Sequence, residues 1–452
     1  MNTSDPVVTI PIVDTSSSMK DYGYVTLTVI DTCAFLNMAL PGDDIGVASY
    51  DTTGRVTFPL TRVDENGSVQ TKATDAVQRL KFSGSTSIGA GIRTAVGMLP
   101  ASSTTDKRPR ALVLLSDGEE NRLPDALPLP AGTPPIYTCS MGPFADLNLM
   151  EKIATKSGGK HYDAPRIDSL MKIYEQIRAQ TSGANLLGNV HKELKGPGKL
   201  SLSATASEGN DLLQFSVAWS DPQIPFHNGS REEGKLSVEL VDPWGRILTP
   251  KEIRQGPASV VLNVPQAQAG EWELLVMYGG TQPQELTAGI LQYAHSGKAA
   301  AIVLSEEVPA TVKAGTPLRF SVGLTDDGEA VAGQQILATV TKPKLSIKNA
   351  LNTYAPLLED VVLPEEATDS PTDPNIAKLK ALYQARLPHE DLLPHITSVF
   401  GLSVGKDGRY EGVSEDTLQA GMYNIELQVT GFSEKSKTPF SRSKLFSVLV
   451  TD

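Results

Sequence analysis

The chain has 452 residues, of which 40% are hydrophobic and 20% are charged, and its formal net charge is -12. One hydrophobic core does not grow to this length, so the sequence predicts about two to four folded domains. The acidic charge and the lack of a basic stripe argue against a nucleic-acid partner. No apolar run approaches the roughly 20 residues that a membrane-spanning helix needs. Residues 1–6 lack the basic segment and the cleavage site of a signal peptide.

Residues 1–183 alternate strand-like and helix-like segments. Continuous apolar runs at 7–13 and 111–115 predict strands that are covered on both faces. The apolar residues between Tyr24 and Leu40 are spaced for one face of a helix. Further strands are expected at 45–50, 56–60 and 136–141, and further helices at 71–80, 87–99, 146–157 and 167–181. This alternation predicts a doubly wound, Rossmann-like α/β domain with a mainly parallel sheet.

The pattern changes after residue 183, where short runs of alternating polarity are separated by turn residues. Such runs are typical of all-β sandwiches. The first set of strands is expected at 212–219, 235–241, 259–264, 271–278 and 286–293. The second set is expected at 301–304, 317–324, 335–341, 409–411, 421–430 and 445–450. We therefore expect an α/β domain at 1–183, a β-sandwich at 184–298 and a second sandwich at 299–452.

The stretch at about 345–395 does not fit strands, and we interpret it as an insertion in the last domain. It contains an acidic, proline-rich loop and then apolar residues with helical spacing over 375–387. Pro374 occupies a suitable first helical position, and Asp373 is a suitable N-cap.

Polar residues in three predicted loops form the candidate site. The first strand ends in Asp-x-Ser-x-Ser at 14–18, the loop 84–89 precedes a helix, and the loop 116–120 follows a buried strand. Doubly wound sheets bind ligands beyond the carboxyl ends of their strands. Carboxylate and hydroxyl oxygens suit hard divalent cations. Each loop alone is more typical of an ordinary turn, but together they predict a metal site whose ligands are Asp14, Ser16, Ser18, Thr86 and Asp117.

These motifs resemble those of the von Willebrand factor A domain over residues 7–181. The segment 14–18 matches the Asp-x-Ser-x-Ser motif of that family, and Asp117 matches its aspartate before glycine. Thr86 matches the Gly-Gly-Thr-x-Ile motif, with Ser85 in place of the second glycine. The segment 41–46 resembles the linker that follows the first helix of the family. The resemblance implies a sheet with one antiparallel edge strand, which we place at 56–60.

The resemblance also implies a metal-ion-dependent adhesion site. Ser16, Ser18 and Thr86 would hold the ion directly, and Asp14 and Asp117 would act directly or through water. Two carboxylates and three neutral hydroxyls leave the ion electrophilic, so an open position would favour a carboxylate from a partner protein. We therefore expect a non-enzymatic, metal-dependent protein-binding or adhesion module that uses Mg²⁺ or Mn²⁺ rather than Ca²⁺.

Two other functions stay open from the sequence. The chain is alternatively a docking subunit of a larger machine, such as a chelatase-like ATPase assembly or a secreted protease-regulator. A degenerate A domain acting as a scaffold is the third interpretation, and the intact set of five site residues argues against it. The sequence does not indicate an oligomeric state.

The rest of the chain is similar to calcium-activated chloride channel regulator proteins. The segments that carry the similarity are 117–121, 241–245, 269–272, 407–410 and 421–423. The similarity implies that the two sandwiches are immunoglobulin- or fibronectin-like modules. The zinc protease region of that family has no counterpart, because no His-Glu-x-x-His is present. The similarity favours an extracytoplasmic or cell-surface location, whereas the lack of a visible signal peptide keeps a cytoplasmic location open.

Other candidate groups receive structural interpretations. Cys33 and Cys139 lie in apolar surroundings and are expected to be buried thiols, with a disulfide or a reactive thiol as the alternative. His389 and His395 are separated by a proline and do not have the spacing of zinc ligands on a helix, so we interpret them as part of a polar loop.

Three more groups are assigned to the surface, to a linker or to the core. Glu119 and Glu120 are expected to form a solvated rim beside the site. The segment 192–199 is expected to be a linker rather than a nucleic-acid patch. Core packing is the expected role of the tryptophans Trp219, Trp244 and Trp272.

Overall fold

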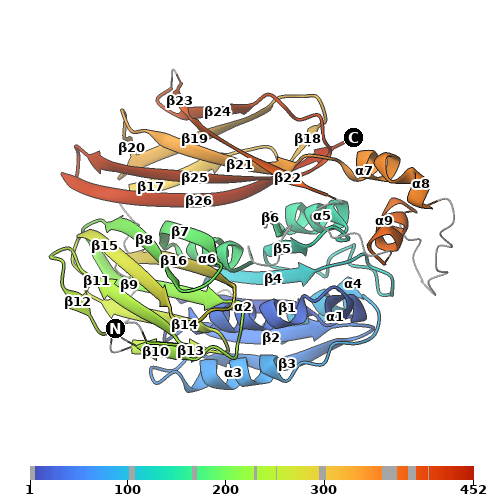
Figure 1. The fold of residues 1–452 in the computed structure, drawn as a ribbon, viewed down its shortest axis with the longest axis horizontal. Helices are drawn as coiled ribbons and strands as arrows, with labels where there is room; N and C mark the ends of the chain where they lie inside the picture. Colours follow the sequence, from blue (N-terminus) through green and yellow to red (C-terminus); the bar gives the residue numbers. More distant parts are fainter. Residues whose placement is uncertain are drawn as a thin grey trace.

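The computed structural model describes residues 6–100, 107–164, 170–228, 232–250, 252–294, 302–358, 374–384, 393–405 and 407–452. Figure 1 shows an N-terminal α/β unit in blue to cyan, a first β unit in green to yellow beside it, and a second β unit in orange to red above both. The predicted multidomain architecture, an α/β domain followed by all-β sheets, is confirmed.

The α/β unit is built on a six-stranded sheet in the order β3-β2-β1-β4-β5-β6. Its parallel strands are β1 (Val8–Asp14), β2 (Asp44–Tyr50), β4 (Arg110–Ser116), β5 (Ile136–Met141) and β6 (His161–Ala164). The edge strand β3 (Gly54–Arg62) runs antiparallel to β2, as predicted for 56–60. β6 was not predicted from the sequence.

Helices cover both faces of this sheet. They are α1 (Ser17–Asp21), α2 (Val25–Asn37), α3 (Ser68–Gln78), α4 (Ile88–Met98), α5 (Leu147–Ser157) and α6 (Leu170–Ser182). Ile10 and Ile12 of β1 pack in a cluster with residues of α4 and α5, whereas Val13 packs with residues of α2 and α3. Every residue of β1 is therefore buried, which explains its continuous apolar sequence. The short helix α1 was not predicted, and residues 167–169 of the predicted last helix lie outside the described residues.

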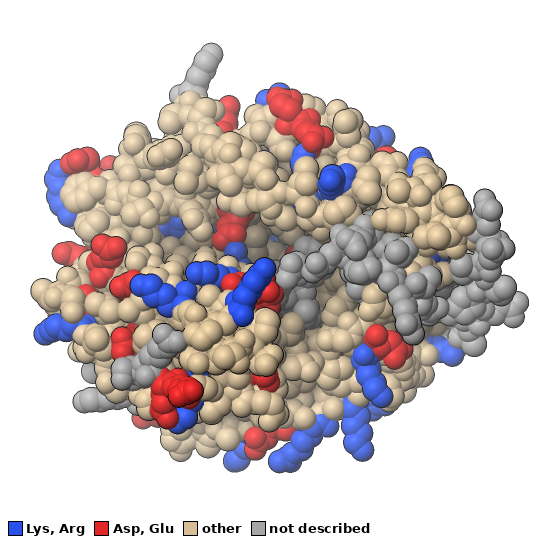
Figure 2. Space-filling model, viewed as in Figure 1, with Lys and Arg blue, Asp and Glu red and all other residues tan. Residues whose placement is uncertain are grey.

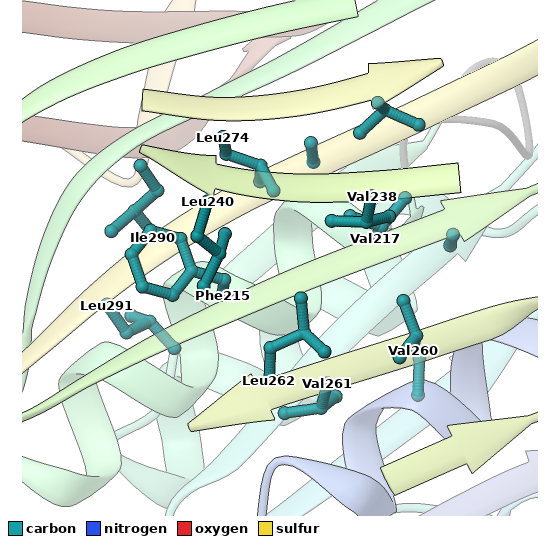
Figure 3. Close-up of a cluster of buried hydrophobic side chains, with 14 of the residues drawn as sticks. Phe215, Val217, Val238, Leu240, Val260, Val261, Leu262, Leu274, Ile290 and Leu291 are labelled. Atoms are coloured by element: carbon teal, nitrogen blue, oxygen red, sulfur yellow. The ribbon is translucent and has the colours of Figure 1, made fainter. Parts of the chain in front are cut away.

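The first β unit consists of the sheets β10-β11-β15-β8, with β12 paired to β11, and β13-β14-β9-β16-β7. Its strands are β7 (Asn185–Leu194), β8 (Gly198–Ala206), β9 (Asn210–Trp219), β10 (Phe226–Asn228), β11 (Leu236–Val241), β12 (Ile247–Leu248), β13 (Glu252–Gly256), β14 (Ser259–Pro265), β15 (Gly270–Tyr278) and β16 (Gln284–Ala294). Figure 3 shows the apolar cluster of this unit, in which Phe215 and Ile290 lie close to Leu240 and Leu274 of the facing sheet.

Two predictions about this unit are wrong. The segment 192–199 is not a linker, because it forms the end of β7, a turn and the start of β8. Trp219 and Trp272 are buried as predicted, but Trp244 is 58% exposed. Trp244 lies in the turn after β11, where its backbone N–H donates to Asp242, and its ring packs under the guanidinium of Arg246 instead of in a core.

The second β unit has the sheets β17-β19-β24-β23, with β20 paired to β19, and β18-β26-β25-β21-β22. Its strands are β17 (Ile302–Glu307), β18 (Thr311–Lys313), β19 (Leu318–Asp326), β20 (Glu329–Ala330), β21 (Ile336–Pro343), β22 (His395–Gly401), β23 (Ser403–Val404), β24 (Tyr410–Ser414), β25 (Gly421–Ser433) and β26 (Thr438–Thr451). The helices α7 (Ile347–Thr353), α8 (Ala355–Leu358) and α9 (Pro374–Gln384) lie between β21 and β22. Pro374 begins α9 as predicted, while Asp373 and residues 385–387 lie outside the described residues.

The α/β unit and the first β unit share buried surface. Ile30, Ala34 and Met38 from the region of α2, and Met171 of α6, belong to the same apolar cluster as the interior of the first β unit. The second β unit contacts α6 as well, since the backbone N–H of Leu445 donates to the Gln176 side chain. Helix α6 therefore lies at the junction of all three units (Figure 1).

Two kinds of partner surface are relevant among the described residues, a membrane-spanning helix in the whole described chain and a basic patch on the face shown in Figure 2. None of the described helices is long and apolar enough to cross a membrane. In Figure 2, Lys and Arg are interspersed with Asp and Glu among the coloured residues of the face shown. This face therefore lacks the continuous basic surface, among its described residues, that nucleic-acid binding requires.

Candidate metal centre

The predicted site residues lie in three loops at one edge of the α/β sheet. Asp14 ends β1 and Asp117 directly follows β4, and these two strands are parallel neighbours, so their carboxyl ends meet at the same edge. The loop before α4 joins them there. The backbone N–H of Ser17 donates to the Gly84 carbonyl over 3.0 Å, and that of Ser83 donates to the Thr15 carbonyl over 2.8 Å.

Four of the five predicted residues form one hydrogen-bonded chain. The Ser16 backbone N–H donates to Asp14 Oδ1 over 2.9 Å. The Ser16 and Ser18 hydroxyl oxygens lie 2.9 Å apart, and the Ser18 hydroxyl donates to Asp117 Oδ1 over 2.8 Å. The spacing of two residues in the motif therefore places the hydroxyls of Ser16 and Ser18 in contact with each other.

Thr86, the fifth predicted residue, is buried and is held through its backbone. Its N–H donates to Asn121 Oδ1 over 2.8 Å, and its carbonyl accepts from the backbone N–H of Asn121 over 2.9 Å. Asn121 therefore fastens the Thr86 loop to the loop that carries Asp117. Asn121 was not predicted as a site residue, and its place four residues after Asp117 is the signal in the sequence that could have identified it.

Asp14 is oriented by two further residues that the sequence did not single out. Tyr50 Oη lies 3.0 Å from Asp14 Oδ2, and the Ser116 hydroxyl donates to the same oxygen over 3.1 Å. Gly91 of α4 leaves room for the Tyr50 ring, because a Cβ at this position would lie 2.6 Å from a ring carbon. Tyr50 ends β2 and Ser116 ends β4, so neighbouring strand ends fix one face of the carboxylate.

The electrostatics of the site are those of two buried acids. Asp14 and Asp117 are both 0% exposed. Burial raises the pKa of Asp14, and burial followed by the charge of Asp14 raises the pKa of Asp117 well above its ordinary value. The hydrogen bond from Ser18, and after it the charge of Lys380 on α9, act in the opposite direction on the Asp117 pKa. Asp117 Oδ2 is buried and has no hydrogen-bond partner among the described residues.

This donor set fits a hard divalent cation. All of the candidate ligands offer oxygen, and a buried carboxylate oxygen without a partner costs free energy that a cation would offset. The described residues contain no cluster of three or more His, Cys, Asp or Glu side chains suited to a metal. A metal at this site would therefore depend on the hydroxyls of Ser16, Ser18 and Thr86 in addition to the two acids.

The glutamates beside the site differ from the predicted solvated rim. Glu120 Oε1 accepts from the Gly89 backbone N–H over 2.8 Å, and Glu120 Oε2 accepts from the Ala126 N–H over 2.9 Å. These two backbone hydrogen bonds hold the Glu120 carboxylate at the beginning of α4, where the helix dipole favours a negative charge. Glu119 is half-buried.

The remaining candidate groups lie away from the site. Cys33 and Cys139 are buried free thiols, as predicted, so the alternative of a disulfide is wrong. Burial raises the pKa of Cys33 to about 12 and raises that of Cys139 further, so neither is a reactive thiol. His395 begins β22 and therefore is not in a loop, and His389 lies outside the described residues.

Comparisons with known proteins place the N-terminal part of the chain in a known domain family. Residues 9–120 match the model of the von Willebrand factor type A domain. No curated protein matches the chain. Similar solved structures include von Willebrand factor type A from Catenulispora acidiphila, with 17% sequence identity and a TM-score of 0.36. The alignment covers 72% of this chain and 64% of that chain.

Two further structures are similar to parts of the chain. The ArnB paralog VWA2 from Sulfolobus acidocaldarius has 12% identity and a TM-score of 0.31, covering 72% of this chain and 63% of that one. Proximal thread matrix protein 1 from the mussel byssus, with a zinc-occupied MIDAS motif, has 15% identity and a TM-score of 0.35, covering 42% and 50%. The chain spans less than two thirds of the length of each of these three proteins. Residues 9–120 belong to the von Willebrand factor type A domain family, and the chain continues this domain with all-β sheets.

Proposed function

We propose that the chain is a non-enzymatic, metal-dependent protein-binding module. Mg²⁺ or Mn²⁺ is held by the oxygens of Asp14, Ser16, Ser18, Thr86 and Asp117, and a carboxylate of a partner protein completes the coordination. The observation that carries this proposal is the Asp117 carboxylate. Its Oδ1 accepts from Ser18, while its buried Oδ2 has no hydrogen-bond partner within the described part of the chain.

The charge balance supports capture of an acidic group. Two ionised carboxylates offset a divalent cation, and the three hydroxyls contribute no charge, so the ion supplies Lewis acidity toward a further anionic ligand. Asp14 is already oriented by Tyr50 and Ser116, so the site would need little rearrangement to accept the ion. A prepared site of this kind reduces the cost of ordering ligands on binding.

The β units support the same proposal by holding the α/β unit firmly. The shared apolar cluster and the contacts of α6 fix the α/β unit against both β units. The three site loops lie at the carboxyl end of the sheet, where β1 and β4 end. We infer that the β units act as a support that presents the metal site at one end of the molecule.

Calorimetric titration of Mn²⁺ into the full chain tests the metal site. The native protein should bind one ion, and Asp117→Ala should abolish binding while its circular dichroism stays native. Ser17→Ala is the matched control, since Ser17 is exposed and lies in the same loop. Absence of binding at millimolar Mn²⁺, or native Mn²⁺ affinity in Asp117→Ala, would contradict the proposed metal site.

A peptide titration tests the chemistry of the partner. A fluorescent poly-glutamate peptide should bind the native chain in Mn²⁺ but not in EDTA, and a poly-glutamine peptide should bind in neither. Binding of poly-glutamate that persists in EDTA would show that the metal is not the acceptor of the carboxylate.

A further inference from the structure

A cavity of about 560 Å³ lies where the α/β unit, the second β unit and its inserted helices meet. Figure 1 shows α5 of the α/β unit beside α7 and α9, below strands of the second β unit, and residues of all three helices line the cavity. This volume falls within the range of about 300–1,000 Å³ that is usual for small-molecule sites. None of the five candidate metal ligands is among the described residues that line it, so the cavity is separate from the metal centre.

Apolar side chains form much of the cavity wall. They come from α5, α7, α9 and the strands β25 and β26, and include Leu147, Ile347, Ile376, Met422, Leu449 and Val450. Ile376 of α9 also belongs to the apolar cluster that contains Phe144, so packing holds this part of the wall in place. A wall that is already ordered favours a ligand with an apolar body, because the ligand buries surface without a further ordering cost.

One buried carboxylate, that of Asp163 on β6, accompanies these apolar walls. Asp163 is only 8% exposed. Burial raises its pKa to about 7 against a hydrogen bond with the Asn424 side chain, and no basic side chain within the described part of the chain contributes to the shift. A buried carboxylate without a cation either takes up a proton or pairs with a cation from outside the protein.

The other charges around the cavity leave Asp163 without a counter-ion. Helix α5 begins here, and its N-terminus is capped by Asp146, which accepts from a backbone N–H of the first turn over 2.9 Å. Lys348 and Asp452 also line the cavity, but both residues are exposed and their charges are opposite in sign. His395 is the remaining titratable residue of the described lining, and a histidine is neutral at about pH 8.

We propose that this cavity is a second binding site, which takes a small organic cation with an apolar body and a protonated amine. The apolar body lies against the walls formed by α5, α7, α9 and β25, and the ammonium group pairs with the ionised carboxylate of Asp163. The charge-assisted hydrogen bond selects the cation over a neutral molecule of the same shape, since the neutral molecule leaves the buried acid without its partner. This site needs no metal and therefore goes beyond the proposed function.

Two probes of nearly equal shape, 2-phenylethylammonium and 2-phenylethanol, test the site. Saturation-transfer difference NMR follows their titration into the full chain at about pH 8 in EDTA, which keeps the metal centre out of the measurement. The native chain should bind the ammonium at least about tenfold more tightly than the alcohol. Asp163→Asn should remove this preference, whereas the control Glu271→Gln, at an exposed acid that does not line the cavity, should retain it.

A second variant tests the cavity independently of the charge. Ala420 lines the cavity and is half-buried, so Ala420→Phe should narrow the cavity and weaken both probes while its circular dichroism stays native. Equal affinity of the native chain for the two probes, or absence of ammonium binding at millimolar concentration, would overturn the inference. Native ammonium affinity in folded Asp163→Asn or in folded Ala420→Phe would overturn it as well. Each of these results would leave the metal centre untouched, because that site is tested separately with Mn²⁺.

Discussion

A buried ion pair lies at the junction of the α/β unit and the first β unit, and it predicts that the two units unfold cooperatively. Arg178 of α6 donates to Asp43 Oδ2 over 2.8 Å and to Tyr293 Oη of β16 over 3.1 Å. The side chains of Arg178 and Asp43 are only 3% and 2% exposed. We predict that Arg178→Met destabilises both units together, because it leaves the Asp43 carboxylate buried without its cation.

The remaining contacts of Asp43 set the size of the effect. Asp43 also accepts from the backbone N–H of Val7 over 2.9 Å and from that of Leu40 over 2.8 Å. Removal of one partner from a buried ion pair costs about 3–5 kcal/mol, and two remaining donors favour the lower end of that range. Arg178→Met should therefore lower the free energy of unfolding by about 3 kcal/mol.

Urea unfolding followed by two probes provides the assay. All three tryptophans, Trp219, Trp244 and Trp272, lie in the first β unit, so tryptophan fluorescence reports on that unit. Far-UV circular dichroism reports mainly on helices, and α1–α6 belong to the α/β unit. The two transitions should coincide in the native chain and should move together to lower urea in Arg178→Met.

The control is an ion pair at the surface of the α/β unit. The side chain of Arg62 is 63% exposed and pairs with Asp44, so Arg62→Met should change the stability by less than about 1 kcal/mol. A shift of the dichroism transition alone in Arg178→Met, with the fluorescence transition unmoved, would refute the idea that the two units share one core. A shift no larger than that of Arg62→Met would refute the estimated cost.

Two further predictions concern buried groups. Burial raises the pKa of Glu175 from 4.5 to about 7, so the folded chain keeps a proton that the unfolded chain releases, and stability falls as pH rises through that interval. Glu175→Gln should therefore be more stable than the native chain by up to about 3 kcal/mol at about pH 8 and should lose this gain at about pH 4.5. Urea unfolding at the two pH values measures the gain, and an equal gain at both would contradict the burial argument. Cys33 and Cys139 should be inert to a thiol reagent in the folded protein and reactive in urea, because burial raises the pKa of both thiols; rapid labelling of the folded chain would show that one of them is accessible.

Much of the α/β unit could be predicted because its signals are local. The apolar runs of β1 and β4 reflect strands buried on both faces, and the motif at 14–18 places two hydroxyls within contact of each other. Asn121 and Tyr50 could not be predicted as supports of the site, since each acts through a partner that is distant in the sequence.

The errors elsewhere have physical causes. The polar composition of the segment 192–199 predicts a linker, but the segment includes the end of β7 and the start of β8, whose side chains face solvent on one side. Tryptophan is a large apolar residue of the kind that usually packs in a core, but Trp244 lies in a turn that leaves its side chain exposed to solvent. The docking of α9 on Phe144 depends on how the units pack, which no local pattern encodes. The similarity of the β units to calcium-activated chloride channel regulator modules stays a prediction.

A crystal structure of the full chain grown with Mn²⁺ tests the metal site most directly, because the anomalous signal of manganese locates the ion independently of the protein atoms. We predict an anomalous peak bounded by the hydroxyls of Ser16, Ser18 and Thr86, with Asp14 and Asp117 beside it. A structure with Mn²⁺ bound elsewhere, or with these five residues unchanged and no peak between them, would contradict the central claim.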